Sequence, residues 1–68
     1  MNEFKINGDY ITISQLLKVL DYVVSGGETK YFLLENECLL NEVPIYEKNK
    51  KIRVGDIVTI NGKRFLMI

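Results

Sequence analysis

The sequence predicts an α+β domain in which two helices pack against a small antiparallel β-sheet. Two periodicities support this class: apolar residues recur at helical spacing between positions 13 and 35, and from position 38 onward they alternate as in strands. The expected order is a short hairpin, two helices and then the strands of the sheet. A chain of 68 residues has room for one domain, residues 1–68, with a small core.

The N-terminal segment is expected to form a hairpin followed by a helix. Asn7-Gly8 lies between two short β-prone runs, and this dipeptide favours a hairpin turn because both residues tolerate positive φ. Thr12 and Gln15 have the spacing of a capping box, which predicts a helix over residues 13–24 with Thr12 as its N-cap. The apolar stripe of this helix comprises Ile13, Leu16, Leu17, Leu20 and Val23 or Val24.

A second helix is predicted over residues 26–35. Ser25 and Glu28 repeat the capping-box spacing, so Ser25 is the expected N-cap. Gly26 and Gly27 follow it, and they permit a tight reversal of the chain between the helices. They would equally let a nucleic-acid backbone approach the N–H groups of the helix N-terminus, and both interpretations stay open.

The second helix is expected to have a core face and an outer face. Lys30 and Tyr31 point away from the core, and Asn36 should end the helix in the left-handed conformation. The residues expected to face the core are Thr29, Phe32 and Leu33.

The remaining chain is expected to form strands. Residues 38–41 alternate in polarity, and Pro44 restricts the segment that follows to a sheet edge. Residues 54–68 are predicted to form a hairpin that turns at Asn61-Gly62. The inward-facing residues of these strands are Cys38, Leu40, Val58, Ile60, Phe65 and Met67.

The composition argues against most catalytic and metal sites. The chain has no histidine and one cysteine, so it cannot assemble a Ser-His or Cys-His pair or the usual metal-ligand sets, and we expect no enzyme and no cofactor. Cys38 is interpreted as a small core residue. There is no apolar run long enough for a membrane span and no visible signal peptide, so we expect a cytoplasmic protein without a membrane partner.

The net charge is zero, but the charge is unevenly distributed. Residues 1–47 carry three lysines against eight carboxylates, and residues 48–68 carry six cations against Asp56, so the two parts have charges of −5 and +5. Such asymmetry indicates an anionic partner on one face, although a basic loop can also be merely solvated. The densest cluster comprises Lys48, Lys50, Lys51 and Arg53.

The ordered set of these motifs resembles the ribosomal-protein-S-four-type RNA-binding domain, also called the αL motif. The stretch "SGGETKYFLLENECLLNE", the basic loop and "VGDIVTI" follow one another as in that family, and "QLLKVL" with the short chain resembles its YaaA-like bacterial branch. The resemblance implies two helices that present an RNA-facing surface. The matching residues are Ser25, Lys30, Phe32, Leu33, Leu40, Asn41, Gly55, Asp56 and Val58.

The expected RNA-binding residues combine this resemblance with the charge pattern. The resemblance implies that Lys18 and Lys30 lie on one surface, and clustered cations gain affinity by releasing counterions from RNA. Tyr31 either stacks on a base or covers a neighbouring helix. The complete predicted set is Lys18, Ser25, Gly26, Gly27, Lys30, Tyr31, Asn41, Lys48, Lys50, Lys51 and Arg53.

The sequence therefore predicts a small non-catalytic RNA-binding protein. Its expected partners are structured RNA, as rRNA, tRNA or ribosomal particles, recognised more by shape than by sequence. The alternative is a protein-interaction module that keeps the fold with weak or no RNA affinity. The zero net charge and the carboxylates near the helical face support this alternative, so a protein partner remains open.

Overall fold

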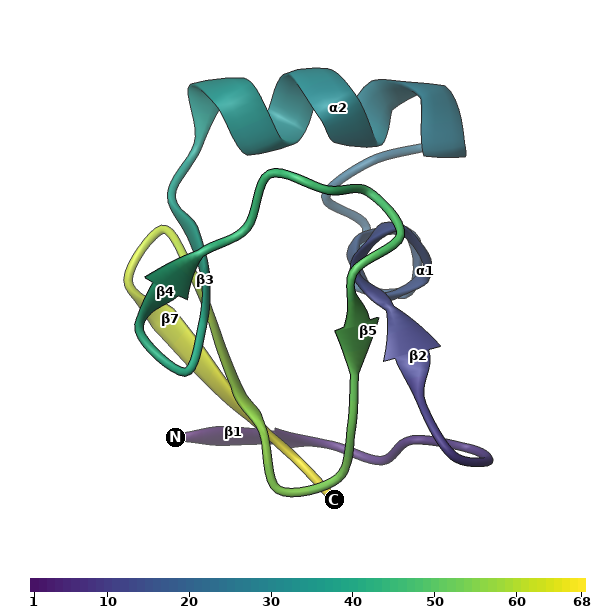
Figure 1. The fold of residues 1–68 in the computed structure, drawn as a ribbon, viewed down its shortest axis with the longest axis vertical. Coiled ribbons are helices and arrows are strands. Elements are labelled where there is room, and N and C mark those ends of the chain that lie inside the picture. The colour runs from purple at the N-terminus through teal and green to yellow at the C-terminus, as the bar shows by residue number, and fades with distance from the viewer.

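The computed structural model describes residues 1–68 and confirms the α+β class (Figure 1). The two helices lie on one side of the strands, and a loop after β4 runs beneath α2 before it turns down into β5. The elements in chain order are β1 (Asn2–Phe4), β2 (Ile11–Thr12), α1 (Ile13–Val19), α2 (Gly26–Glu35), β3 (Cys38–Leu40), β4 (Val43–Pro44), β5 (Lys51–Ile52), β6 (Ile57–Ile60) and β7 (Lys63–Met67).

The main sheet has the strand order β1-β7-β6-β3-β4. The predicted C-terminal hairpin is confirmed: β6 and β7 are antiparallel, and Asn61 and Gly62 turn between them with φ of 49° and 86°. Pro44 lies in β4 at the sheet edge, as expected from its missing N–H donor. Five of the six residues predicted to face inward are buried, and Leu40 is partly buried.

The hairpin predicted at Asn7-Gly8 is wrong, because β1 and β2 do not pair with each other. Instead β1 runs parallel to β7, and the Ile68 N–H donates to the Phe4 carbonyl at 2.8 Å while the Ile6 N–H donates to the Ile68 carbonyl at 2.8 Å. The C-terminal strand thus satisfies the backbone groups that a hairpin would have used. The main sheet is therefore mixed, with one parallel pair at its edge.

Helix α1 begins as predicted and ends earlier than predicted. The Thr12 capping box is confirmed: the Gln15 N–H donates to Thr12 Oγ1 at 3.2 Å, and the Thr12 N–H donates to Gln15 Oε1 at 2.9 Å. The helix stops at Val19, and Asp21 adopts the left-handed conformation with φ of 64°. Val23 is still buried, because the segment after the helix folds back onto Leu17.

Helix α2 has the predicted bounds, and Thr29 and Leu33 are buried in it. Phe32 is only partly buried, against the ring of Tyr22 at a centroid distance of 5.6 Å. Asn36 ends the helix, but its φ is −130°, so the left-handed conformation predicted for it is wrong. Its backbone N–H and its side-chain amide both donate to the Phe32 carbonyl, which makes a left-handed turn unnecessary.

Buried polar contacts fix the helices to each other and to the basic segment. Ser14 and Thr29 share a buried hydroxyl–hydroxyl hydrogen bond of 2.9 Å between α1 and α2. The Ile13 and Ser14 N–H groups donate to the carbonyls of Lys50 and Lys48, at 2.9 Å and 3.1 Å. These bonds satisfy free donors of the α1 N-terminus and hold residues 48–50 beside α1. Neither helix has the length and apolar content needed to cross a membrane.

Candidate nucleic-acid interface

The structure distributes the four cations of the basic segment over three parts of the surface. Strand β5 pairs with β2, and within it Ile52 is fully buried while its neighbours Lys51 and Arg53 are exposed. Because side chains alternate along a strand, these two cations share the face opposite Ile52. Lys48 and Lys50 precede the strand and line two different hollows: Lys48 lines one at the N-terminal end of α2, and Lys50 lines one formed by β3, β4 and the loop after β4.

Lys48 lines a hollow of about 330 Å³ at the N-terminal end of α2. We call this the helix-side hollow. It brings together residues from α2 and from the loop after β4, and no carboxylate side chain lines it. Lysine ammonium groups and the first N–H groups of a helix both attract anions, so the hollow is chemically suited to phosphate. Its lining residues are Gly26, Gly27, Lys30, Tyr46 and Lys48.

The two glycines do not make the reversal between the helices. Residues 20–25 turn the chain, and Gly26 and Gly27 already lie inside α2 without positive φ. A Cβ atom on Gly26 would lie 3.5 Å from Ser14 Oγ, and one on Gly27 would lie 3.8 Å from Ser25 Oγ, both ordinary contacts. The fold therefore does not require glycine at either position. Because these two residues have no side chains, they leave the N-terminus of α2 uncovered.

The carboxylate of Glu28 is directed away from this hollow. It accepts hydrogen bonds from the N–H groups of Val24 at 2.9 Å and Ser25 at 3.3 Å, which places Ser25 as the N-cap. Glu28 lines a separate hollow together with Glu35 and Tyr31. Tyr31 is 64% exposed, as predicted for a residue off the core, but its immediate surroundings are acidic.

The Asn41 side chain is hydrogen-bonded to other residues of the protein. Its backbone is left-handed with φ of 50°, its Oδ1 accepts from the Ile57 N–H at 2.9 Å, and its Nδ2 donates to Asp56 Oδ1 at 3.0 Å. The other oxygen of Asp56 accepts from the Arg53 N–H at 2.8 Å. This network fastens the β3–β4 turn to the loop before β6, so the Asn41 amide is already hydrogen-bonded at both ends.

Another basic group lies around β2 and β5, and we call it the ribbon-side cluster. Lys51 Nζ lies 4.8 Å from the centroid of the Tyr10 ring, and the guanidinium carbon of Arg53 lies 5.8 Å from it. Tyr10 also lines a hollow of about 530 Å³ with Lys5 and Lys18. Lys18 and Lys30 line no hollow in common. The ribbon-side cluster comprises Lys5, Tyr10, Lys18, Lys51 and Arg53.

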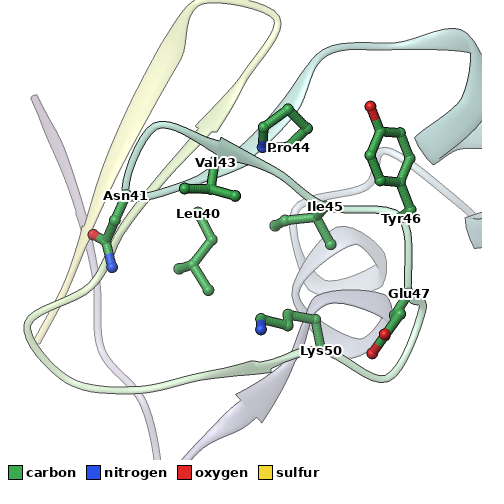
Figure 2. Close-up of a pocket in the computed structure, with 8 residues that line it drawn as sticks. All are labelled: Leu40, Asn41, Val43, Pro44, Ile45, Tyr46, Glu47 and Lys50. Carbon is green, nitrogen blue, oxygen red and sulfur yellow. The ribbon is translucent and has the colours of Figure 1, made fainter.

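Tyr46 is a surface residue that the sequence analysis missed. It is 73% exposed and borders three hollows: the helix-side hollow, a hollow beneath α2 that includes Leu34, and one of about 410 Å³ that includes Lys50. Figure 2 shows this last hollow, with Leu40 and Lys50 pointing inward and Tyr46 at the rim. Its position two residues before Lys48 was the signal that could have identified it.

The single thiol of the chain lies in the core. Cys38 is buried, and burial raises the pKa of its thiol to about 11, so the thiol stays protonated at neutral pH. No group of three or more His, Cys, Asp or Glu side chains is placed to hold a metal ion.

Two comparisons relate this sequence to known proteins. The family model described as "S4 domain" matches residues 4–68. The chain is also 43% identical over 61 residues to a Bacillus subtilis (strain 168) protein named "Probable ribosome maturation protein RlbA". That alignment covers 90% of this chain and 86% of the Bacillus protein.

Proposed function

Because this chain belongs to the S4 domain family, we propose that it is a small non-catalytic protein that binds structured RNA, either rRNA or tRNA, through its basic surface. The name of the Bacillus relative, a probable ribosome maturation protein, supports ribosomal particles as the partner and the cytoplasm as the place of action. The observation that carries the proposal is the helix-side hollow, where Lys30 and Lys48 flank an uncovered helix N-terminus without a carboxylate.

The proposed mechanism is electrostatic positioning. Lysine side chains that bind phosphates release the counterions condensed on RNA, which gives affinity without reading sequence. The two glycines let an RNA backbone approach the first turn of α2, where N–H groups are free. The protein would then recognise the spacing of phosphates in a folded RNA, which is shape rather than base identity.

The test is the salt dependence of binding to a structured RNA hairpin. About four to six phosphate contacts predict a log–log slope of affinity against salt of roughly −3 to −5. Fluorescence anisotropy at increasing salt measures this slope. An affinity that is unchanged between low and physiological salt would contradict the electrostatic mechanism.

A protein-interaction module is the second candidate function. Leu34 and Val43 are 67% and 63% exposed, and they lie close to Tyr46 and the neighbouring hollows. Capture from lysate with and without ribonuclease separates the two functions. Retention of RNA that ribonuclease abolishes supports the RNA-binding function, whereas a protein partner that survives ribonuclease, with no RNA retained, supports the interaction module.

A further inference from the structure

The four tyrosines of the chain differ in whether a ring face is available to a ligand. Tyr22 is partly buried and packs against Phe32. Tyr10 already has two cations over its ring. Tyr31 is exposed, but Glu28 and Glu35 line the same hollow and would repel a phosphate backbone.

Tyr46 is the tyrosine with a free ring that also borders a hollow lined by lysines and no carboxylate. It is the most exposed of the four, and no aromatic or cationic group packs on it. On one side it borders the helix-side hollow with Lys30 and Lys48. On the other side it borders the hollow of Figure 2, where apolar side chains and Asn41 are joined by one lysine, Lys50, and one carboxylate, Glu47. These two opposite charges leave that hollow without net charge, so it suits an uncharged base, and the phosphates are assigned to the helix-side hollow, which no carboxylate lines.

We propose that Tyr46 is a stacking platform for an unpaired base of the bound RNA. The inference rests on the proposed RNA-binding function and specifies its ligand: a structured RNA that presents a bulged or looped-out nucleotide. The base lies on the Tyr46 ring at the mouth of the 410 Å³ hollow, and the phosphates flanking it lie in the helix-side hollow.

Physical chemistry supports this arrangement. An exposed phenol ring offers a rigid apolar face to any base, and stacking on it does not require a particular sequence. The hollow beside it is lined by the apolar side chains of Leu40, Val43 and Ile45, which suit a base rather than a phosphate. A base paired within an A-form helix cannot reach such a face, so an unpaired nucleotide is required.

The experiment uses two RNA hairpins of equal length, each of which contains one 2-aminopurine. In the first, 2-aminopurine is a single-nucleotide bulge; in the second it pairs with uracil and the extra nucleotide is moved to the terminal loop. The protein should bind the bulged hairpin more tightly and quench its 2-aminopurine fluorescence. Tyr46→Phe should preserve both effects, because the ring is retained, and Tyr46→Ala should weaken binding to the bulged hairpin roughly 5- to 100-fold.

Tyr31→Ala is the matched control, since Tyr31 is 64% exposed and Tyr46 is 73% exposed. Both alanine variants should melt like the unsubstituted protein, because neither ring is in the core. If Tyr46→Ala binds both hairpins as tightly as the unsubstituted protein does, the stacking proposal is wrong and RNA binding still stands. If the unsubstituted protein binds neither hairpin at low salt, the proposed function itself fails and the stacking role fails with it.

Discussion

The helix-side hollow and the ribbon-side cluster contain the same kinds of residue, but only in the ribbon-side cluster do cations lie over the tyrosine ring. Each combines cations with a tyrosine, yet Tyr10 is 42% exposed beneath Lys51 and Arg53, whereas Tyr46 is 73% exposed with nothing on its ring. In the ribbon-side cluster the cations and the ring already interact with each other, which is worth about 0.5–1 kcal/mol at an exposed site. A ligand there must displace existing contacts, and a ligand at the helix-side hollow need not.

The two surfaces also depend on different parts of the scaffold. The helix-side hollow exists only while α2 is docked through Thr29 and Leu33, whereas the ribbon-side cluster depends on the short β2–β5 pairing. We therefore expect cations that are close in sequence to contribute differently to RNA affinity. The variants below test that expectation, beginning with the largest expected effect.

Leu33→Ala should lower the free energy of unfolding by about 2–5 kcal/mol, because it removes a buried side chain beneath α2. Leu34→Ala is the matched control: Leu34 is 67% exposed, so its loss should cost less than about 0.5 kcal/mol. Phe32→Ala should have an intermediate cost, since Phe32 is only partly buried. Chemical denaturation measures all three, and equal effects of Leu33→Ala and Leu34→Ala would mean that the face of α2 is assigned incorrectly.

Charge reversal compares the two surfaces directly. Lys30→Glu with Lys48→Glu should weaken RNA binding and reduce the salt slope by about 2, one unit for each lost phosphate contact. Lys51→Glu with Arg53→Glu makes the same change in net charge on the ribbon-side cluster and should have the smaller effect on affinity. Anisotropy at several salt concentrations measures both quantities.

Lys63→Glu with Arg64→Glu controls for diffuse attraction, because these cations on β7 line neither surface. Lys5 is unsuitable for this purpose, since it lies beside Lys18. Equal losses from all three double variants would indicate that net charge alone attracts RNA. A larger loss from the ribbon-side variant would reverse the ranking of the two surfaces.

Alkaline pH should destabilise the fold through Cys38, which lies beside Leu33 beneath α2. The folded pKa is about 11 against 9.0 for an unperturbed thiol, so the unfolded chain loses its proton first as the pH rises. Stability from this group is therefore complete below pH 9 and declines toward pH 11, by on the order of 1 kcal/mol after allowing for partial solvation of the thiol. Denaturation of Cys38→Ala across the same pH range isolates the effect from tyrosine and lysine titration, and identical pH profiles would contradict it.

Gly27→Ala should have the smallest effect on stability. It also tests whether RNA approaches the helix-side hollow closely. An added Cβ has only ordinary contact, so the variant should be about 0.5 kcal/mol more stable through reduced freedom of the unfolded chain. If RNA approaches the first turn of α2 closely, the same methyl group should weaken binding. A stabilised variant with unchanged affinity would show that the glycines do not serve a close approach.

The sequence by itself determined the elements that depend on neighbouring residues. The Thr12 capping box, the bounds of α2 and the Asn61-Gly62 hairpin are set by side chains within a few positions of one another, and all three are confirmed. The alternation expected in β6 and β7 identified Val58, Ile60, Phe65 and Met67 as buried for the same reason, although Thr59 on the opposite face of β6 is buried as well.

Only the tertiary structure decided which distant segments meet. The N-terminal strand pairs with the C-terminus rather than with its neighbour, because Ile68 lies where it can satisfy the backbone of residues 4–6. The cations of residues 48–53 separate onto three parts of the surface, and the burial of Ile52 places Lys51 and Arg53 together on the opposite face of β5. Local sequence does not encode these choices, since they depend on which backbone groups and apolar faces remain unpaired once the rest of the core has formed.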